Sequence, residues 1–348
     1  MPQRNKSLSI LKGLVFATLV SGVNFSLFAS DNSEQGVIEA LDEGNIVVAQ
    51  ERFSNLTEVQ KNTLSGKILQ SRILFREDNT EDSYELLEAL SENNKDNAEV
   101  YYYFGRSAIV MAQKVSIFSK LGYASEALES WEHALTLNPN HIETLEGLIS
   151  FHLGAPSIAG GDIEKGLGYA KTLVTLDSEK GYANLAKVYW QQDKNDLAEK
   201  AIADGLAITP NSVEIYFTLG SVYSGQAKEN STLWKEARLA LNKALEYAES
   251  AQEKQHVLYQ LGKVAVNSGE EIQAGIIALE QLFSLKTDQY QQWGRYRLAQ
   301  LYFDDNQPGK AKDVIAMVEY QDDEELEDQV KSLAKKIKKA VKKLANVS

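Results

Sequence analysis

The sequence of 348 residues contains no cysteine and only 5 prolines. Without cysteine the chain can form no disulfide, and it can carry no lipid of the kind attached to cysteine in lipoproteins. Proline inside a helix removes a hydrogen bond and clashes with the preceding turn, so its scarcity permits long helices. Apolar residues make up 43% of the chain and recur at the helical period over long stretches. The sequence therefore predicts an all-α fold.

Motifs of catalysis and metal binding are also scarce. Gly160-Gly161 is preceded by no predicted strand and followed by no Gly-Lys-Ser/Thr, so it does not indicate a phosphate loop. Asp162 predicts a helix N-cap there instead. The four histidines form no His-Glu-x-x-His pair, and no nucleophile elbow is present. We expect no cofactor, no metal and no catalytic residues, with an enzyme of unknown reaction as the weakest alternative.

Acidic residues outnumber basic ones, with 49 Asp and Glu against 36 Lys and Arg and a net charge of −13. Three positive charges fall in the first 29 residues and seven lysines in the last twenty, so residues 30–328 carry −23. Nucleic-acid binding requires a basic footprint on the phosphates. We therefore expect no nucleic acid as the main partner.

The first 29 residues have the layout of a secretory signal peptide. Arg4, Lys6 and Lys12 precede the apolar run 14–20, and Ala29 leads into a polar segment, which predicts a cut after Ala29. An uncleaved membrane anchor is the alternative, although polar residues interrupt the apolar run before it reaches the length of a span. The predicted location is periplasmic or secreted.

Near residue 180 the sequence begins to repeat itself. Residues 179–212 carry the ordered positions Tyr182, Leu185, Ala186, Tyr189, Ala198, Ile202, Gly205 and Pro210. Residues 213–254 return the same register with Tyr216, Leu219, Gly220, Tyr223, Ala237, Leu241 and Ala244. This spacing resembles the tetratricopeptide repeat, whose unit of two helices buries its apolar face only by stacking on neighbours. The resemblance implies a right-handed α-solenoid that serves as a binding scaffold.

Counting outward from these two units predicts about eight helix-turn-helix hairpins. They begin near residues 30, 64, 98, 142, 179, 213, 255 and 292, and the third has extra residues between its halves, around Lys114 to Gly122. The predicted domains are the signal peptide 1–29, degenerate hairpins 30–97, the repeat solenoid 98–325 and a basic C-terminal capping helix 326–348. Residues 155–162, followed by Leu176-Asp177 and Gly181, also resemble a stretch that recurs in exported bacterial repeat proteins.

Small residues recur where the two helices of a hairpin should cross. They are Gly105, Ala186, Gly220, Gly262 and Ala299 on the first helix, and Ala127, Ala198, Ala237, Ala274 and Ala311 on the second. Only a hydrogen or a methyl group there lets the helices reach the short end of the usual interaxial distance. We therefore predict that these residues lie in the core.

The last twenty residues combine an apolar stripe with many lysines. The stripe consists of Val330, Leu333, Ile337, Val341 and Leu344. The other positions include Lys331, Lys335, Lys336, Lys338, Lys339, Lys342 and Lys343. We predict a capping helix whose stripe covers the last repeat. The disfavoured alternative is a basic amphipathic helix that contacts a membrane surface through residues 329–348.

The resemblance also implies where a partner would bind. In tetratricopeptide repeats the first helix of each hairpin lines the concave face, with positions 2, 5, 9 and 12 pointing inward. Carried onto this sequence, these positions select Tyr102, Arg106, Lys187, Trp190, Phe217, Tyr259 and Lys263. Some members clamp a terminal carboxylate with Lys at position 5 and Asn at position 9. This chain has neither there, so that specificity is not expected.

These observations predict a non-catalytic scaffold of the bacterial cell envelope that binds a protein or peptide in its concave groove. Aromatic and arginine side chains are the usual anchors of interfaces, and a long groove suits an extended or helical peptide. The alternative is a structural adaptor that docks through its convex face, or through its basic C-terminal helix at the membrane.

Overall fold

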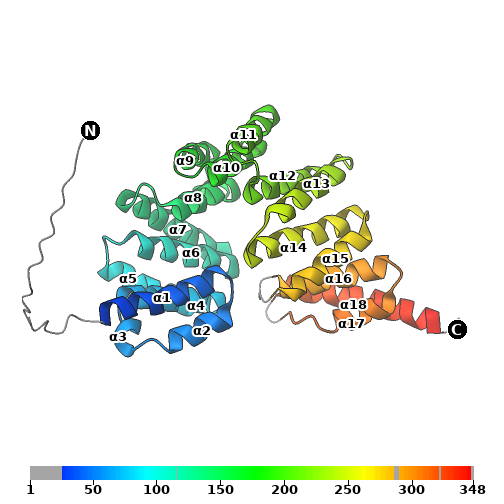
Figure 1. Cartoon of the computed structure of the whole chain (residues 1–348), viewed down its shortest axis with the longest axis horizontal. Coiled ribbons are helices and arrows are strands. Elements are labelled where there is room, and N and C mark those ends of the chain that lie inside the picture. The colour runs from blue at the N-terminus through cyan, green and yellow to red at the C-terminus, as the bar shows by residue number, and fades with distance from the viewer. Residues whose placement is uncertain (1–25, 116, 286–289, 321–322, 346–348) are drawn as a thin grey trace, which may run out of the picture.

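The computed structural model describes residues 26–115, 117–285, 290–320 and 323–345. Throughout these residues the chain is helical, with short turns and no strand. The helices pair into eight hairpins followed by one final helix (Figure 1). The predicted α-solenoid of helix-turn-helix units is therefore confirmed.

The first four hairpins occupy residues 26–176. Their helices are α1 (Ser26–Asp42) with α2 (Ile46–Ser54), α4 (Leu64–Arg76) with α5 (Thr80–Asn93), α6 (Ala98–Lys114) with α7 (Ile117–Leu137), and α8 (Ile142–Gly154) with α9 (Ile163–Leu176). The short helix α3 (Glu58–Lys61) links the first hairpin to the second, and the 3-10 turn η1 (Ser157–Ala159) precedes α9.

The last four hairpins follow the same plan. They are α10 (Ser178–Gln191) with α11 (Asn195–Ile208), α12 (Val213–Gln226) with α13 (Leu233–Tyr247), α14 (Ala251–Ser268) with α15 (Ile272–Ser284), and α16 (Gln291–Asp304) with α17 (Pro308–Ile315). The final described helix is α18 (Glu324–Ala345). Every hairpin begins within four residues of the start that the repeat spacing predicts.

Polar side chains fix where several of these helices begin. The carboxylate of Asp162 accepts hydrogen bonds from the backbone N–H groups of Glu164 and Lys165 at 3.0 and 3.3 Å, so the predicted N-cap is confirmed. At the start of α12 the hydroxyl of Ser212 accepts from the N–H of Ile215 at 2.9 Å. Such caps satisfy N–H groups that have no partner within the helix.

The extra residues of the third hairpin lengthen its helices and do not form a separate loop. α6 has 17 residues and α7 has 21, whereas α10 and α11 have 14 each. The segment around Lys114 to Gly122 therefore belongs mostly to α7. Repeat spacing detects such an insertion but does not show whether the extra residues extend a helix or form a loop.

The predicted signal peptide lies largely outside the described residues, which begin at Ser26. The predicted cut after Ala29 falls within α1. Val37 and Ala40, beyond that position, are buried in the core of the first hairpin, so a cut there would leave this core intact. Among the described residues, no helix combines the length and the apolar character that a membrane span requires.

In three hairpins the two helices approach each other at a glycine of the first helix. A Cβ atom built on Gly105 would lie 2.7 Å from Trp131 Nε1, and one built on Gly220 would lie 2.6 Å from Leu241 Cγ. At Gly262 the same atom would lie 2.5 Å from Leu279 Cγ. These distances are shorter than carbon contacts allow, so the helices pack this closely only because the positions lack a side chain.

The prediction that Ala274 forms the crossing of the seventh hairpin is wrong. Ala274 is exposed and its neighbour Gly275 is buried. A Cβ on Gly275 would lie 2.3 Å from Ala265 Cβ. The reason is one additional residue in the first helix. α14 continues for six residues after Gly262, whereas α10 continues for five after Ala186, and this moves the crossing by one position.

The apolar stripe of α18 covers the last hairpin, as predicted. Leu326, Val330, Leu333 and Ile337 are between 1% and 7% exposed and belong to the same core as α14 to α17. Val341 packs on its edge. The side chain of Leu344 lies outside the described residues. Because the stripe is occupied by protein, α18 closes the solenoid and presents its lysines to solvent.

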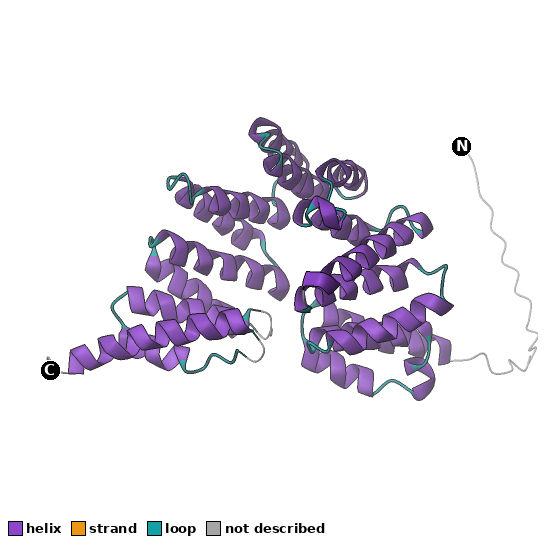
Figure 2. Cartoon of the chain, turned by 180° about the vertical axis from the view of Figure 1, so that it is seen from behind, coloured by secondary structure: helices purple, strands orange, loops and turns teal. Residues whose placement is uncertain are grey.

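The hairpins follow a strongly curved path, so that the molecule forms an arch (Figures 1 and 2). The turn between α1 and α2 approaches α14 from the opposite arm, since a Cβ on Gly44 would lie 3.9 Å from Gln255 Nε2. Lys114 of α6 and Trp293 of α16 line one solvent-open cavity between the arms. The two arms of the arch therefore come close to each other on the inner side of the solenoid.

The crossing geometry predicts the effect of adding a side chain to α12. Gly220→Leu should destabilise the protein by about 1–3 kcal/mol or more, because the new atoms overlap Leu241. Gly225→Leu is the control, since a Cβ at that position of the same helix meets nothing within 4 Å. Urea unfolding of both variants measures the difference. Equal stability would contradict the assigned crossing.

The packing of α18 predicts that its stripe stabilises the eighth hairpin. Ile337→Ala should destabilise the protein by about 2–5 kcal/mol, since the residue is 1% exposed. Lys338→Ala, at the exposed position beside it, should leave stability within about 0.5 kcal/mol of the parent. Thermal melts followed by circular dichroism test this, and a parent-like melt of Ile337→Ala would refute the capping role.

Candidate binding surface of the concave face

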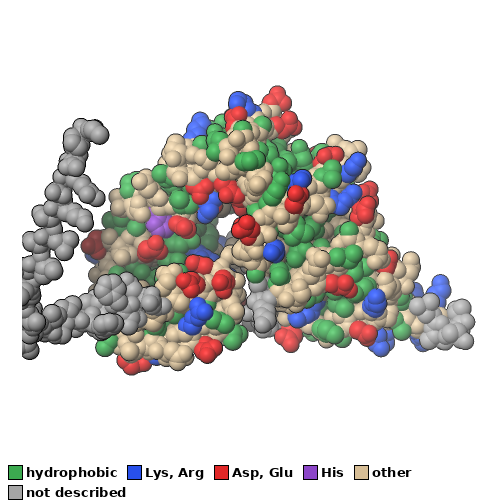
Figure 3. All heavy atoms as spheres, viewed as in Figure 1, with side chains coloured by type: hydrophobic (Ala, Val, Ile, Leu, Met, Phe, Trp, Pro, Cys, Tyr) green, Lys and Arg blue, Asp and Glu red, His purple; other side chains and the backbone are tan. Residues whose placement is uncertain are grey.

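The first helices of the hairpins form the inner layer of the arch. Consecutive first helices contact one another along the chain, from α4 through α6, α8, α10, α12 and α14 to α16. Figure 1 shows α10 and α12 on the inner side of α11 and α13. The space-filling view shows a hollow at the centre of the arch, with charged side chains at its edge (Figure 3). Residues on this inner layer are the candidates for binding.

Three inner helices of the C-terminal arm carry a connected series of rings, which we call the aromatic ladder. The ring of Phe217 on α12 lies 6.5 Å from that of His256 on α14, and His256 lies 5.6 Å from Tyr290. Tyr290 stacks on Tyr259 with 4.3 Å between ring centres and 7° between planes. Trp293 on α16 completes the set. These rings are partly exposed, and those of Phe217, Tyr259, Tyr290 and Trp293 also pack against the core.

An arginine contacts two rings of the aromatic ladder, those of Tyr259 and Trp293. Arg297 on α16 donates a hydrogen bond from Nε to the hydroxyl of Tyr259 at 3.1 Å. Its guanidinium carbon lies 5.6 Å from the centre of the Tyr259 ring and 5.7 Å from that of Trp293. Both distances are within the range of cation–π attraction. The guanidinium is therefore held close to two aromatic side chains.

A second cation, Lys263, lies close to Arg297. Burial lowers the pKa of Lys263, and the positive charges of Arg297 and Lys228 lower it further. Within the described part of the chain, no carboxylate oxygen lies within 4.0 Å of Lys263 or Arg297. Two partly buried cations without a counter-charge are costly in the free protein. An acidic group of a partner would compensate them.

In the middle of the inner layer, two lysines form ion pairs with glutamates of the same protein. Lys187 Nζ lies 3.0 Å from Glu214 Oε1, and Lys180 Nζ lies 2.8 Å from Glu146 Oε2. The charge of Lys187, one of the residues selected from the repeat register, is therefore already compensated. Its partner Glu214 comes from the next hairpin, which repeat positions alone do not reveal.

Trp190 lies in the core and is not part of the open inner surface. Its side chain is 9% exposed and packs with the core of the fifth hairpin, which includes Ala183 and Ile202. Position 12 points inward in the predicted register, but a tryptophan is long enough to fold back between the two helices. Trp190 therefore stabilises the hairpin and offers little surface to a partner.

Tyr102 and Arg106 lie on α6, in the N-terminal arm. The ring of Tyr102 lies 5.2 Å from that of His141, and its carbonyl accepts a hydrogen bond from Trp131 Nε1 at 3.0 Å. Burial raises the pKa of the Tyr102 hydroxyl, which keeps it protonated. Arg106 places its guanidinium 4.6 Å over the ring of Phe75. These two residues and the aromatic ladder lie on opposite arms of the arch.

The structure thus brings together Phe217, Tyr259 and Lys263 from the predicted set, and adds residues that the sequence did not select. Trp293 occupies position 2 of the eighth hairpin, so the repeat register could have identified it. Tyr290 and Arg297 carry no such signal. Tyr290 adopts a left-handed backbone conformation, with φ of 65°, just before α16. Its ring reaches Tyr259 only because two hairpins pack together.

Within the described residues, no group of three or more His, Asp or Glu side chains is arranged to hold a metal ion.

Comparison with known proteins assigns one of the hairpins to a family. The family model described as tetratricopeptide repeat matches residues 179–212, which span α10 and α11. The search of curated proteins found no match.

Three solved structures are similar to this chain at low sequence identity. A tetratricopeptide repeat protein from Parabacteroides merdae is 12% identical and covers 79% of this chain and 99% of its own, with a TM-score of 0.48. A thermophilic protein of the same kind from Thermus thermophilus is 15% identical, covers 61% and 98%, and scores 0.44. The Cut9–Hcn1 hetero-tetramer of the APC/C is 16% identical, covers 90% and 57%, and scores 0.47.

The assignment depends on the match at residues 179–212 and on the eight hairpins. Three other hairpins have a close helix crossing, at Gly105, Gly220 and Gly262. The chain therefore contains a tetratricopeptide repeat at residues 179–212, within a solenoid of helical hairpins.

Proposed function

We propose that the protein is a non-catalytic scaffold of the bacterial cell envelope, which holds a peptide segment of another protein against its concave face. The tetratricopeptide repeat fold generally serves protein–protein interaction. The observation that carries this proposal is the aromatic ladder with Arg297 and Lys263 on the inner helices α12, α14 and α16.

The chemistry of the ladder matches that of interface anchors. Tyrosine, tryptophan and arginine dominate the binding energy of protein interfaces, because they offer large, rigid surface together with a polar end. Tyr259 stacks on Tyr290, and Arg297 contacts both Tyr259 and Trp293, so little side-chain freedom is left to lose on binding. An extended or helical peptide with apolar side chains fits such a row.

The charges of this surface favour a partner with an acidic group near those side chains. Residues 30–328 carry a net charge of −23, so most of the surface repels an acidic partner. Lys263 and Arg297 form an exception within that field. Local attraction of this kind acts over about a Debye length, near 8 Å at physiological salt. The position of the acidic group would therefore fix the register of the peptide.

Location in the envelope is supported by the signal-peptide layout of the first 29 residues and by the resemblance of residues 155–162 to exported repeat proteins. An adaptor that docks through the convex face is the competing function. Leu239 on α13 and Ile277 on α15 are 50% and 52% exposed on the outer helices, and they give that alternative a surface to test. Docking through α18 would rely on its lysines, since its stripe is buried.

The proposal predicts which substitutions weaken partner binding. Tyr259→Ala should reduce affinity at least several-fold, because a buried aromatic anchor contributes more than about 1 kcal/mol. Leu239→Ala on the convex face is the matched control and should bind like the parent. The measurement is affinity of folded variants for the partner captured by crosslinking from envelope fractions. Loss of binding in Leu239→Ala alone would favour the adaptor.

Reversing the charge at Lys263 should change the salt dependence of association. Lys263→Glu removes one of the two uncompensated cations and gives Arg297 an internal counter-charge. Association should become slower and less sensitive to salt. Lys235→Glu, at an exposed position of α13, controls for net charge. Association rates of both variants are measured at two ionic strengths. An equal salt dependence of the rate in the two variants would exclude a role for Lys263.

Export predicts a shortened mature protein. Mass spectrometry of the native protein should find its N-terminus near Ser30, within α1. Envelope fractions should contain this form. Recovery of protein that begins at Met1 from the cytosol would rule out the envelope part of the proposal and would leave the groove to be tested separately.

A further inference from the structure

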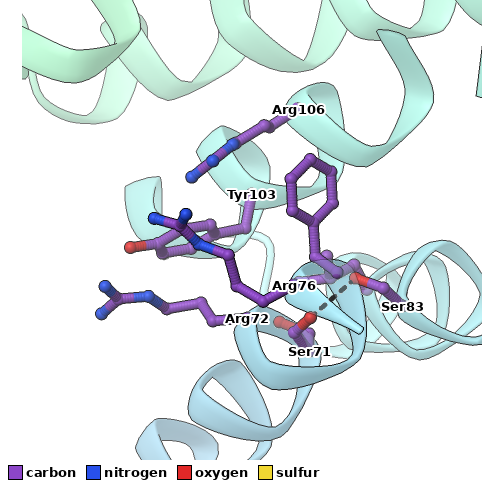
Figure 4. A pocket seen from close by; sticks show the side chains of 8 residues that line it. Ser71, Arg72, Arg76, Ser83, Tyr103 and Arg106 are labelled. Atoms are coloured by element: carbon purple, nitrogen blue, oxygen red, sulfur yellow. Dashed lines mark hydrogen bonds between the residues drawn. The ribbon is translucent and has the colours of Figure 1, made fainter. Parts of the chain in front are cut away.

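Three arginines gather on the inner face of the N-terminal arm. Arg72 and Arg76 lie one turn apart on α4, and Arg106 lies on the neighbouring inner helix α6. They line one pocket together with Tyr103. Figure 4 shows their side chains pointing to the same side, with the Tyr103 ring among them. We call these four residues the arginine cluster.

Contacts with neighbouring groups hold each guanidinium in place. Arg72 lies 2.6 Å from Asp42 Oδ1 and 5.4 Å from the centre of the Tyr103 ring. Arg106 lies over the ring of Phe75. Arg76 donates to the carbonyl of Leu41 at 3.5 Å, which is a long hydrogen bond. The cluster is therefore already assembled in the free protein, so a ligand would not have to reorder these side chains.

The cluster carries more positive than negative charge. Of the carboxylates in the described residues, Asp42 alone lies within 4.0 Å of one of the three guanidinium groups. Burial lowers the pKa of Arg76, and the charges of Arg106 and Arg72 lower it further. Like charges brought together in a partly buried site repel each other. Two positive charges are left without a nearby counter-charge.

We propose that the arginine cluster binds a doubly charged oxyanion, namely a phosphate group. The two negative charges of the phosphate group would balance the two guanidinium charges that have no nearby carboxylate. The planar guanidinium presents paired N–H donors at the spacing of phosphate oxygens. The Tyr103 hydroxyl adds a donor, since burial raises its pKa to about 12 and keeps it protonated at neutral pH.

This site stands apart from the proposed peptide surface. The aromatic ladder lies on α12, α14 and α16 of the other arm, whereas the cluster lies on α4 and α6. Its ligand chemistry is that of a phosphate dianion, free or as a monoester. Inorganic phosphate and glycerol phosphate distinguish these two sources without any protein partner, so the result does not depend on the peptide proposal.

Isothermal titration calorimetry of the full chain tests the site with inorganic phosphate, glycerol phosphate and succinate at equal ionic strength. Phosphate should bind saturably, and Arg106→Gln should weaken it by about tenfold or more, as expected for a lost charge-assisted hydrogen bond. Tighter binding of glycerol phosphate would identify a monoester as the ligand. Tighter binding of inorganic phosphate would identify the free ion.

A matched control separates this site from general cation effects. Arg295 also places its guanidinium over a phenylalanine, 5.8 Å from the Phe283 ring, but on the opposite arm. Arg295→Gln should bind phosphate like the parent. Arg76→Met should fold at least as well as the parent, because it relieves repulsion, and should lose phosphate binding. Equal binding by all variants, equal affinity for succinate, or no phosphate binding by the parent would overturn the proposal.

Discussion

The close approach of two helices at a residue without a side chain is the constraint on which this structure depends. At Gly105, Gly220 and Gly262 the partner atoms occupy the place of a Cβ. That contact fixes how the helices of these three hairpins cross, and stacking of hairpins then turns the first helices toward one side. The inner layer, the arch and the position of every candidate residue follow from it.

Function on such a scaffold resides in side chains that the core does not use. The inner helices of the C-terminal arm leave Phe217, Tyr259 and Trp293 partly exposed and connected through Tyr290 and Arg297. In the middle of the arch, the charges of Lys180 and Lys187 are compensated by glutamates of neighbouring hairpins. The N-terminal arm instead concentrates guanidinium groups. One repeat architecture thus presents an aromatic surface on one arm and a cationic pocket on the other.

Periodicity and small residues were sufficient to predict the hairpins, because close helix crossing requires small residues at regular positions of the sequence. The stripe of α18 and the cap at Asp162 were predictable for the same local reason. The binding surface was only partly predictable. One additional residue in α14 moved the crossing from Ala274 to Gly275, and Trp190 turned into the core. The pairing of Lys187 with Glu214 and the stacking of Tyr290 on Tyr259 depend on packing between hairpins, which repeat positions do not encode.

Site-specific photo-crosslinking in the cells that produce the protein shows whether the partner lies against the concave face. A photoreactive phenylalanine analogue would replace Phe217 on the inner helix α12 or Leu239 on the outer helix α13. Binding in the concave face predicts a covalent adduct of defined mass from position 217 and none from position 239. An adduct from position 239 alone would place the partner on the convex face and contradict the account.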